Sequence, residues 1–66
     1  MVSHGELSKR ELQILELVST GKDNEMIGVK LGISRSTVKT HLRNIYIKTN
    51  HHDRVNLAIS YLTSKT

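Results

Sequence analysis

The stretch that decides the fold lies in the middle of the chain, where residues 23–43 read DNEMIGVKLGISRSTVKTHLR. Two helix-capping residues, Asp23 and Ser34, each precede apolar residues at helical spacing. Gly32 lies between the two runs, and glycine readily adopts the left-handed conformation that ends a helix. The stretch therefore predicts two short helices joined by a turn of about three residues.

The apolar residues of this stretch predict how the two helices pack. The expected inner face of the first helix is Met26, Ile27 and Leu31. Gly28 lies one turn before Gly32, and its lack of a side chain lets the helices cross closely. The wedge that fixes their angle is expected to be Ile27, Leu31, Ile33 and Val38. The expected buried stripe of the second helix is Val38, Leu42 and Ile45. That helix is expected to end near Lys48 or Thr49, with Asn50 as the terminator.

One further helix is predicted on each side of this pair. Residues 8–11 form a capping box, in which Ser8 and Glu11 satisfy each other's backbone amides and start a helix over residues 9–20. Its expected inner residues are Ile14, Leu15 and Val18. Asp53 is an N-cap for a fourth helix. The expected core stripe of that helix is Val55, Ala58, Ile59 and Leu62. The predicted fold is therefore all-α, with four short helices.

Length and composition exclude several classes of protein. The 66 residues allow one small domain, expected over residues 7–66, with residues 1–6 as a disordered lead-in or a vector remnant. The chain has no cysteine, which excludes disulfides, thiolate metal sites and thiol nucleophiles and is compatible with a reducing cytosol. It has neither a run of about 18 apolar residues nor a secretory signal, so we expect a soluble, cytoplasmic protein without a membrane span.

No catalytic, metal or cofactor site is expected. Serine, histidine and aspartate occur without a glycine-rich phosphate loop or a nucleophile elbow, so we predict no enzyme activity. His51 and His52 are adjacent and cannot share one helical face, and no further ligands complete a zinc shell. His41, on the flank of the buried stripe, is expected to be a partly buried histidine or a phosphate contact.

The whole chain has a formal net charge of +4, and the positive charge is concentrated in one part of it. Residues 1–34 carry four basic and five acidic side chains, a net of −1. Residues 35–54 carry five basic side chains against one acidic side chain, a net of +4. Such a basic strip is either a solvated face or a surface that binds a polyanion. Charge alone does not decide between them.

The outward face of the third helix favours the polyanion. At about 100° per residue, four polar or basic side chains lie opposite the buried stripe. They are Ser36, Lys39, Thr40 and Arg43. Two helices joined by a glycine-containing turn form a helix-turn-helix, whose second helix fits the major groove of DNA. A generic helical bundle would show the same caps and stripes, but the uneven charge argues against it.

Two groups of side chains on this helix are candidate DNA contacts. Lys39 and Arg43 can reach guanine O6 and N7, and Thr40 can reach a base edge, so these three are the candidate base contacts. At the N-terminus of the helix, hydroxyls, free amides and the helix dipole favour a phosphate. The candidate phosphate contacts there are Ser34, Arg35, Ser36 and Thr37.

Several motifs in this register resemble one known family. They are Leu7-Ser8-Lys9-Arg10-Glu11, Asn24-Glu25-Met26-Ile27 and Leu31-Gly32-Ile33-Ser34-Arg35-Ser36-Thr37-Val38-Lys39-Thr40-His41, followed by Asn44-Ile45, Lys48 and Arg54. Together they resemble the LuxR/FixJ/GerE-type DNA-binding domain over about residues 7–62. The resemblance implies a four-helix domain at the C-terminus of bacterial transcription regulators, commonly preceded by a receiver domain, as in response regulators, or by a ligand-sensing domain.

The resemblance also implies residue roles and partners. It places base contacts at Lys39, Thr40 and Arg43. It places contacts to the DNA backbone at Asn24, Thr37, Asn44 and Lys48. The fourth helix is the usual dimer surface of the family, so double-stranded DNA and a second copy of the chain are the expected partners, with RNA polymerase as a further candidate.

The chain departs from the family pattern at several positions. Met26 stands where Glu is common and Gly28 where Ala is common, which predicts a second helix less stable by about 1 kcal/mol for the glycine. Residues 49–51, Thr-Asn-His, replace a usual Leu-Gly-Val. This replacement removes two apolar anchors between the third and fourth helices.

The fourth helix leaves two interpretations open. Leu57 stands where Ala is common and, with Tyr61 at i+4, forms a second apolar stripe, which is either a dimer seam or a wider core face. A weak dimer on this seam would read half-sites about one helical turn apart. The alternative function is a protein-interaction module that docks through this stripe while the basic strip meets an acidic partner. Neither function explains Ile47, which points toward the polar side of the third helix.

Overall fold

The computed structural model describes residues 6–65 and contains four helices in that range. They are α1 (Lys9–Ser19), α2 (Asn24–Leu31), α3 (Arg35–Thr49) and α4 (Arg54–Lys65). No strand occurs in the described range, so the predicted all-α fold with four helices is confirmed. The lead-in predicted for residues 1–6 lies, apart from Glu6, outside the described residues.

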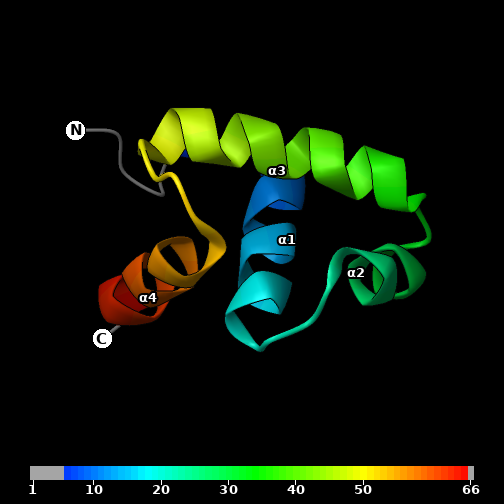
Figure 1. Ribbon diagram of the computed structural model, residues 1–66, viewed down its shortest axis with the longest axis horizontal. Helices are drawn as coiled ribbons and strands as arrows, with labels where there is room; N and C mark the ends of the chain where they lie inside the picture. The colour runs from blue at the N-terminus through cyan, green and yellow to red at the C-terminus, as the bar shows by residue number, and fades with distance from the viewer. Residues whose placement is uncertain (1–5, 66) are drawn as a thin grey trace.

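Figure 1 shows how the four helices are arranged. The long helix α3 lies along one side of the molecule, α1 runs away from it through the middle, and α2 and α4 lie on opposite sides of α1. The main packing contacts join α1 to α4, α2 to α3, and α1 to α3. Because α1 covers only one side of α3, the far side of α3 is left without a covering helix.

The predicted helix caps are present. The capping box joins Ser8 and Glu11, whose side-chain bonds to the opposite backbone amides are 3.1 and 2.8 Å long. The side chain of Asp23 accepts a hydrogen bond from the Met26 amide, and that of Ser34 accepts one from the Thr37 amide. These caps act within one turn of sequence, which is why the sequence alone predicts them.

The helix ends also follow the prediction. Gly32 ends α2 with φ at +69°, and Asn50 ends α3 with φ at +57°, both in the left-handed region. Asp53 accepts a hydrogen bond from the Asn56 amide in the first turn of α4. That bond and a second from the Asn56 side chain hold the pKa of Asp53 below its ordinary value.

The core forms where the four helices meet. Its fully buried side chains are Ile14, Leu15, Ile27, Val38, Ile45 and Leu57. The stripes predicted for residues 9–20 and for the third helix are therefore confirmed. In α2, Ile27 is buried and Leu31 packs against the core, but Met26 is exposed, so its assignment to the inner face is wrong. A helix of only two turns between α1 and α3 buries a narrow stripe.

The predicted core face of α4 is confirmed for Ala58, which packs against the core, and wrong for its other three residues. Val55, Ile59 and Leu62 are 69%, 52% and 49% exposed, whereas Leu57 is fully buried and Tyr61 packs against the core. Both sets repeat at helical spacing, so periodicity could not separate them; the packing of α4 on α1 selects the second. Of the two interpretations of Leu57 and Tyr61, the wider core face is correct. Neither a dimer nor another partner can dock on the buried Leu57.

The turn between α2 and α3 is packed very closely. A Cβ atom added at Gly28 would lie 2.6 Å from the carbonyl oxygen of Ile33, closer than two such atoms can approach. The Ile33 amide in turn donates to the Gly28 carbonyl at 2.9 Å. The predicted close crossing at Gly28 is therefore confirmed, and glycine permits a tight turn that a side chain would open.

Candidate nucleic-acid interface

One face of α3 is open to solvent. Its opposite face buries Val38, Leu42, Ile45 and Thr49. The side chains predicted to point away from the core are all exposed: Ser36, Lys39, Thr40 and Arg43. Thr40 donates from its hydroxyl to the Ser36 carbonyl at 3.2 Å. Its methyl group and the lone pairs of its hydroxyl oxygen, which can accept a hydrogen bond, remain on the exposed face.

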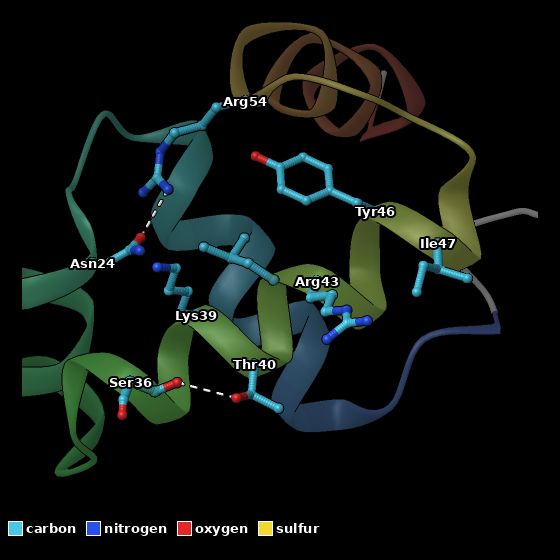
Figure 2. A pocket seen from close by; sticks show the side chains of 9 residues that line it. Asn24, Ser36, Lys39, Thr40, Arg43, Tyr46, Ile47 and Arg54 are labelled. Atoms are coloured by element: carbon cyan, nitrogen blue, oxygen red, sulfur yellow. Dashed lines mark hydrogen bonds between the residues drawn. The ribbon is translucent and has the colours of Figure 1, made fainter.

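This face borders a shallow groove between α3, the start of α2 and the start of α4 (Figure 2). The residues that line it are Asn24, Ser36, Lys39, Thr40, Leu42, Arg43, Tyr46, Ile47 and Arg54. Three of these are cations and none is an anion. Ile47 is 68% exposed and lies on the same side as Arg43, which gives the groove one apolar patch at its end.

The groove has one polar link across it. Arg54 donates from Nη1 to the Oδ1 atom of Asn24 at 2.8 Å and from Nη2 to the Lys22 carbonyl at 2.7 Å. Both Arg54 and Asn24 are half-buried. Of the predicted phosphate contacts, Asn24 and Ser36 thus lie at the groove beside the predicted base contacts.

The predicted phosphate contacts at the start of α3 form a second group. Ser34, Arg35, Ser36 and Thr37 are all exposed. The hydroxyls of Ser34 and Thr37 lie 2.9 Å apart and share a hydrogen bond. This bond fixes the positions of both hydroxyls, while the exposed Arg35 adds a positive charge beside them.

Asn44 and Lys48 lie outside the groove that Lys39 and Arg43 line. Asn44 is exposed. Lys48 is partly exposed, and its ammonium group forms an ion pair with the buried carboxylate of Glu11 at 2.9 Å. Burial raises the pKa of Glu11, but the Ser8 amide and Lys48 together outweigh this effect, so the pKa lies below its ordinary value.

The family described as "Bacterial regulatory proteins, luxR family" matches residues 5–61.

The chain belongs to this luxR family.

Curated relatives carry the same domain. The chain is 48% identical over 56 residues to the transcriptional regulatory protein LiaR of Bacillus subtilis, which covers 85% of the chain and 26% of LiaR. It is 45% identical over 49 residues to a nitrate/nitrite response regulator protein homolog of Haemophilus influenzae, covering 74% of the chain and 24% of that protein. It is 41% identical over 54 residues to the HTH-type transcriptional regulator MalT of Vibrio cholerae, covering 82% of the chain and 6% of MalT. The chain thus spans about a quarter or less of these relatives.

Membership of the luxR family establishes the general role of the domain. The four helices form the DNA-binding helix-turn-helix domain of a transcription regulator family. No helix within residues 6–65 is long and apolar enough to cross a membrane. In the same range, no three His, Cys, Asp or Glu side chains gather where a metal ion could bind.

Sequence reasoning did not find the role of Arg54 in this luxR-family domain. It counted Arg54 as one charge of the basic strip and as one residue of the family motif. Its partners lie 30 and 32 residues away, and no local pattern reports contacts at that distance. The sequence does contain one signal. Arg54 follows the cap residue Asp53 directly, and a residue in the first turn of a capped helix has a defined orientation.

Proposed function

We propose that this domain binds double-stranded DNA in a sequence-specific manner, with α3 in the major groove, as the output domain of a bacterial transcription regulator. The observation that carries the proposal is the exposed cationic face of α3 beside a groove without acidic side chains. A helix of this width fits the major groove of B-DNA, and a cationic surface attracts the phosphates on either side.

Three side chains are proposed as base contacts. Lys39 and Arg43 are long donors on one side of α3, and such donors pair with O6 and N7 of guanine. Thr40 lies beside them with a hydroxyl and a methyl group, which suit a base edge or a thymine methyl.

Contacts to the DNA backbone are proposed around this centre. The proposed residues are Asn24, Ser34, Arg35, Ser36, Thr37, Asn44 and Lys48. The amides and hydroxyls at the start of α3 can donate to a phosphate, and Arg35 supplies charge. Lys48 donates one hydrogen bond to Glu11 and has two further N–H groups that can donate to a phosphate.

A weak homodimer through α4 is proposed, on a different face from the one expected. The exposed apolar strip of Val55, Ile59 and Leu62 replaces the stripe of Leu57 and Tyr61. Pairing this strip with its copy would remove three apolar side chains from water and place two α3 helices on half-sites about one helical turn apart. Cytoplasmic location, control by a receiver domain as in response regulators, and contact with RNA polymerase are further proposals for the whole regulator. The Haemophilus influenzae relative is named a response regulator, which agrees with the second of them.

The test is selection from a pool of randomised duplexes. The 66-residue chain should enrich a defined sequence, and its affinity should fall steeply between two salt concentrations for specific and random DNA alike. The specific duplex should keep an advantage of about a thousandfold or more over random DNA. Enrichment of no sequence, with equal affinity for all duplexes, would contradict sequence-specific binding.

A further inference from the structure

The guanidinium group of Arg54 joins three separate parts of the chain. Arg54 is the first residue of α4, and its two hydrogen bonds reach the Lys22 carbonyl in the loop before α2 and the side chain of Asn24, the first residue of α2. The main packing contacts of α4 are with α1, so these bonds connect α4 directly to the helix-turn-helix.

The bond to Asn24 determines how the Asn24 amide is turned. An asparagine side chain has one oxygen that accepts and one amino group that donates, whereas a guanidinium group only donates. Arg54 therefore holds the Oδ1 atom, and the Nδ2 group of Asn24 is turned away from it. Without this partner, the amide could rotate and present either end to the groove.

The position of this pair connects it with DNA. Asn24 and Arg54 line the same groove as Lys39 and Arg43 (Figure 2). A phosphate oxygen only accepts hydrogen bonds, so an amide held with its amino group free is suited to it and an amide turned the other way is not.

We propose that Arg54 is a positioning residue for DNA binding, which holds the Asn24 amide so that its Nδ2 group donates to a DNA phosphate. This inference rests on the proposed function. Nη1 and Nη2 of Arg54 each donate one hydrogen bond within the protein, which fixes the guanidinium group beside Asn24. Its remaining N–H donors are the rival contact to the phosphate, which the double variant tests. The planar guanidinium also reaches two acceptors at once, which the single ammonium group of a lysine does less well.

The experiment uses a duplex enriched by the wild-type chain and three variants. Asn24→Ala removes the donor, Arg54→Ala removes the positioning group, and a third chain carries both changes. Each single change should weaken binding about threefold to tenfold, as expected for one lost hydrogen bond. The double variant should bind no more weakly than either single variant, because both changes remove the same contact.

Asn24→Asp separates the positioning role from a merely structural one. An aspartate keeps the acceptor for Arg54 but has no amino group to donate. Its melting temperature should equal or exceed that of the wild type, while its affinity for the duplex should fall at least as far as that of Asn24→Ala. Leu12→Ala, a change at a partly buried residue outside the groove, controls for general loss of stability.

Ethylation of individual phosphates gives a local readout. In the wild type, ethylation at one phosphate should interfere with binding through Asn24. Asn24→Ala, Asn24→Asp and Arg54→Ala should each lose interference at that phosphate and keep it at the others. If Arg54→Ala does not fold, Arg54→Lys takes its place and should weaken the same interference.

Two results would overturn the inference while leaving the proposed function in place. Losses that multiply in the double variant would mean that Arg54 contacts DNA by itself. Asn24→Asp binding the duplex as tightly as the wild type would mean that the pair only holds α4 to α2. If the wild-type chain enriches no sequence, the proposed function fails and the inference fails with it.

Discussion

The ammonium group of Lys48 lies 2.9 Å from the carboxylate of Glu11, which joins the end of α3 to the start of α1 across 37 residues of sequence. The same carboxylate accepts a hydrogen bond from the Ser8 amide in the capping box. Glu11 therefore stabilises a helix start and holds α3 on α1 with one side chain, and its removal affects both.

This pair predicts a pH dependence of stability. The pKa of Glu11 is lowered by folding, so its ionised form stabilises the fold. That contribution is present above the ordinary pKa of 4.5 and is lost as the pH falls through the lower pKa of the folded state. At pH 7, Glu11→Gln should reduce the free energy of unfolding by about 1 to 3 kcal/mol, and at about pH 3 the difference should be smaller. Urea unfolding followed by circular dichroism measures both values.

The control for this prediction is Glu16→Gln, a change of the same charge on an exposed part of α1. It should change the free energy of unfolding by less than about 0.5 kcal/mol at either pH. If Glu11→Gln lowered the free energy of unfolding equally at both pH values, the charge of Glu11 would not contribute to its contacts with Lys48 and Ser8.

The exposed face of α3 predicts that removing one of its cationic side chains weakens the preference for a DNA sequence. Lys39→Ala or Arg43→Ala should cost about 1 to 3 kcal/mol on the selected duplex and relax the preference at one base pair. Lys30→Ala removes the same charge from an exposed position outside the groove and should leave the preference intact. Titrations against the selected duplex and its single-base variants measure this. An equal loss on specific and random DNA would remove the residue from the base contacts.

The exposed strip on α4 predicts how binding depends on two half-sites. Ile59→Ser should abolish cooperative binding to a duplex with two half-sites and leave the affinity for one half-site within about twofold, because Ile59 lies outside the groove beside α3. Val29→Ser changes another exposed apolar residue on α2 and should keep cooperativity. Sedimentation of the complexes reports the number of bound chains. Cooperative binding by Ile59→Ser would contradict the proposed dimer face.

The close approach at Gly28 predicts the sign of a single substitution. Alanine is a better helix former than glycine by about 1 kcal/mol, so Gly28→Ala would stabilise an unconstrained helix. Here the added Cβ atom meets the Ile33 carbonyl at 2.6 Å, and the turn must shift. We expect a lower melting temperature for Gly28→Ala and a nearly unchanged one for Val29→Ala on the exposed side of the same helix. A higher melting temperature for Gly28→Ala would show that the turn yields easily.

Much of the candidate site could be predicted because its determinants are local. Ser34 caps α3 by accepting a hydrogen bond from the Thr37 amide three residues away, and the exposed position of Lys39 and Arg43 follows from the period of the helix they occupy. The same reasoning was wrong for Val55, Ile59 and Leu62 and left the place of Leu57 open, because α4 carries apolar side chains on two faces and periodicity identifies no preferred one.

The sequence by itself determined the four helices, their caps, the turn at Gly32, the basic face of α3 and the family, since each of these depends on neighbouring residues or on a motif. The tertiary structure alone decided which face of α4 is buried and which distant residues pair, as Lys48 does with Glu11 and Arg54 with Asn24. The physical reason is that capping and helical periodicity act over a few residues. Pairing across 30 or more residues depends on how whole helices pack.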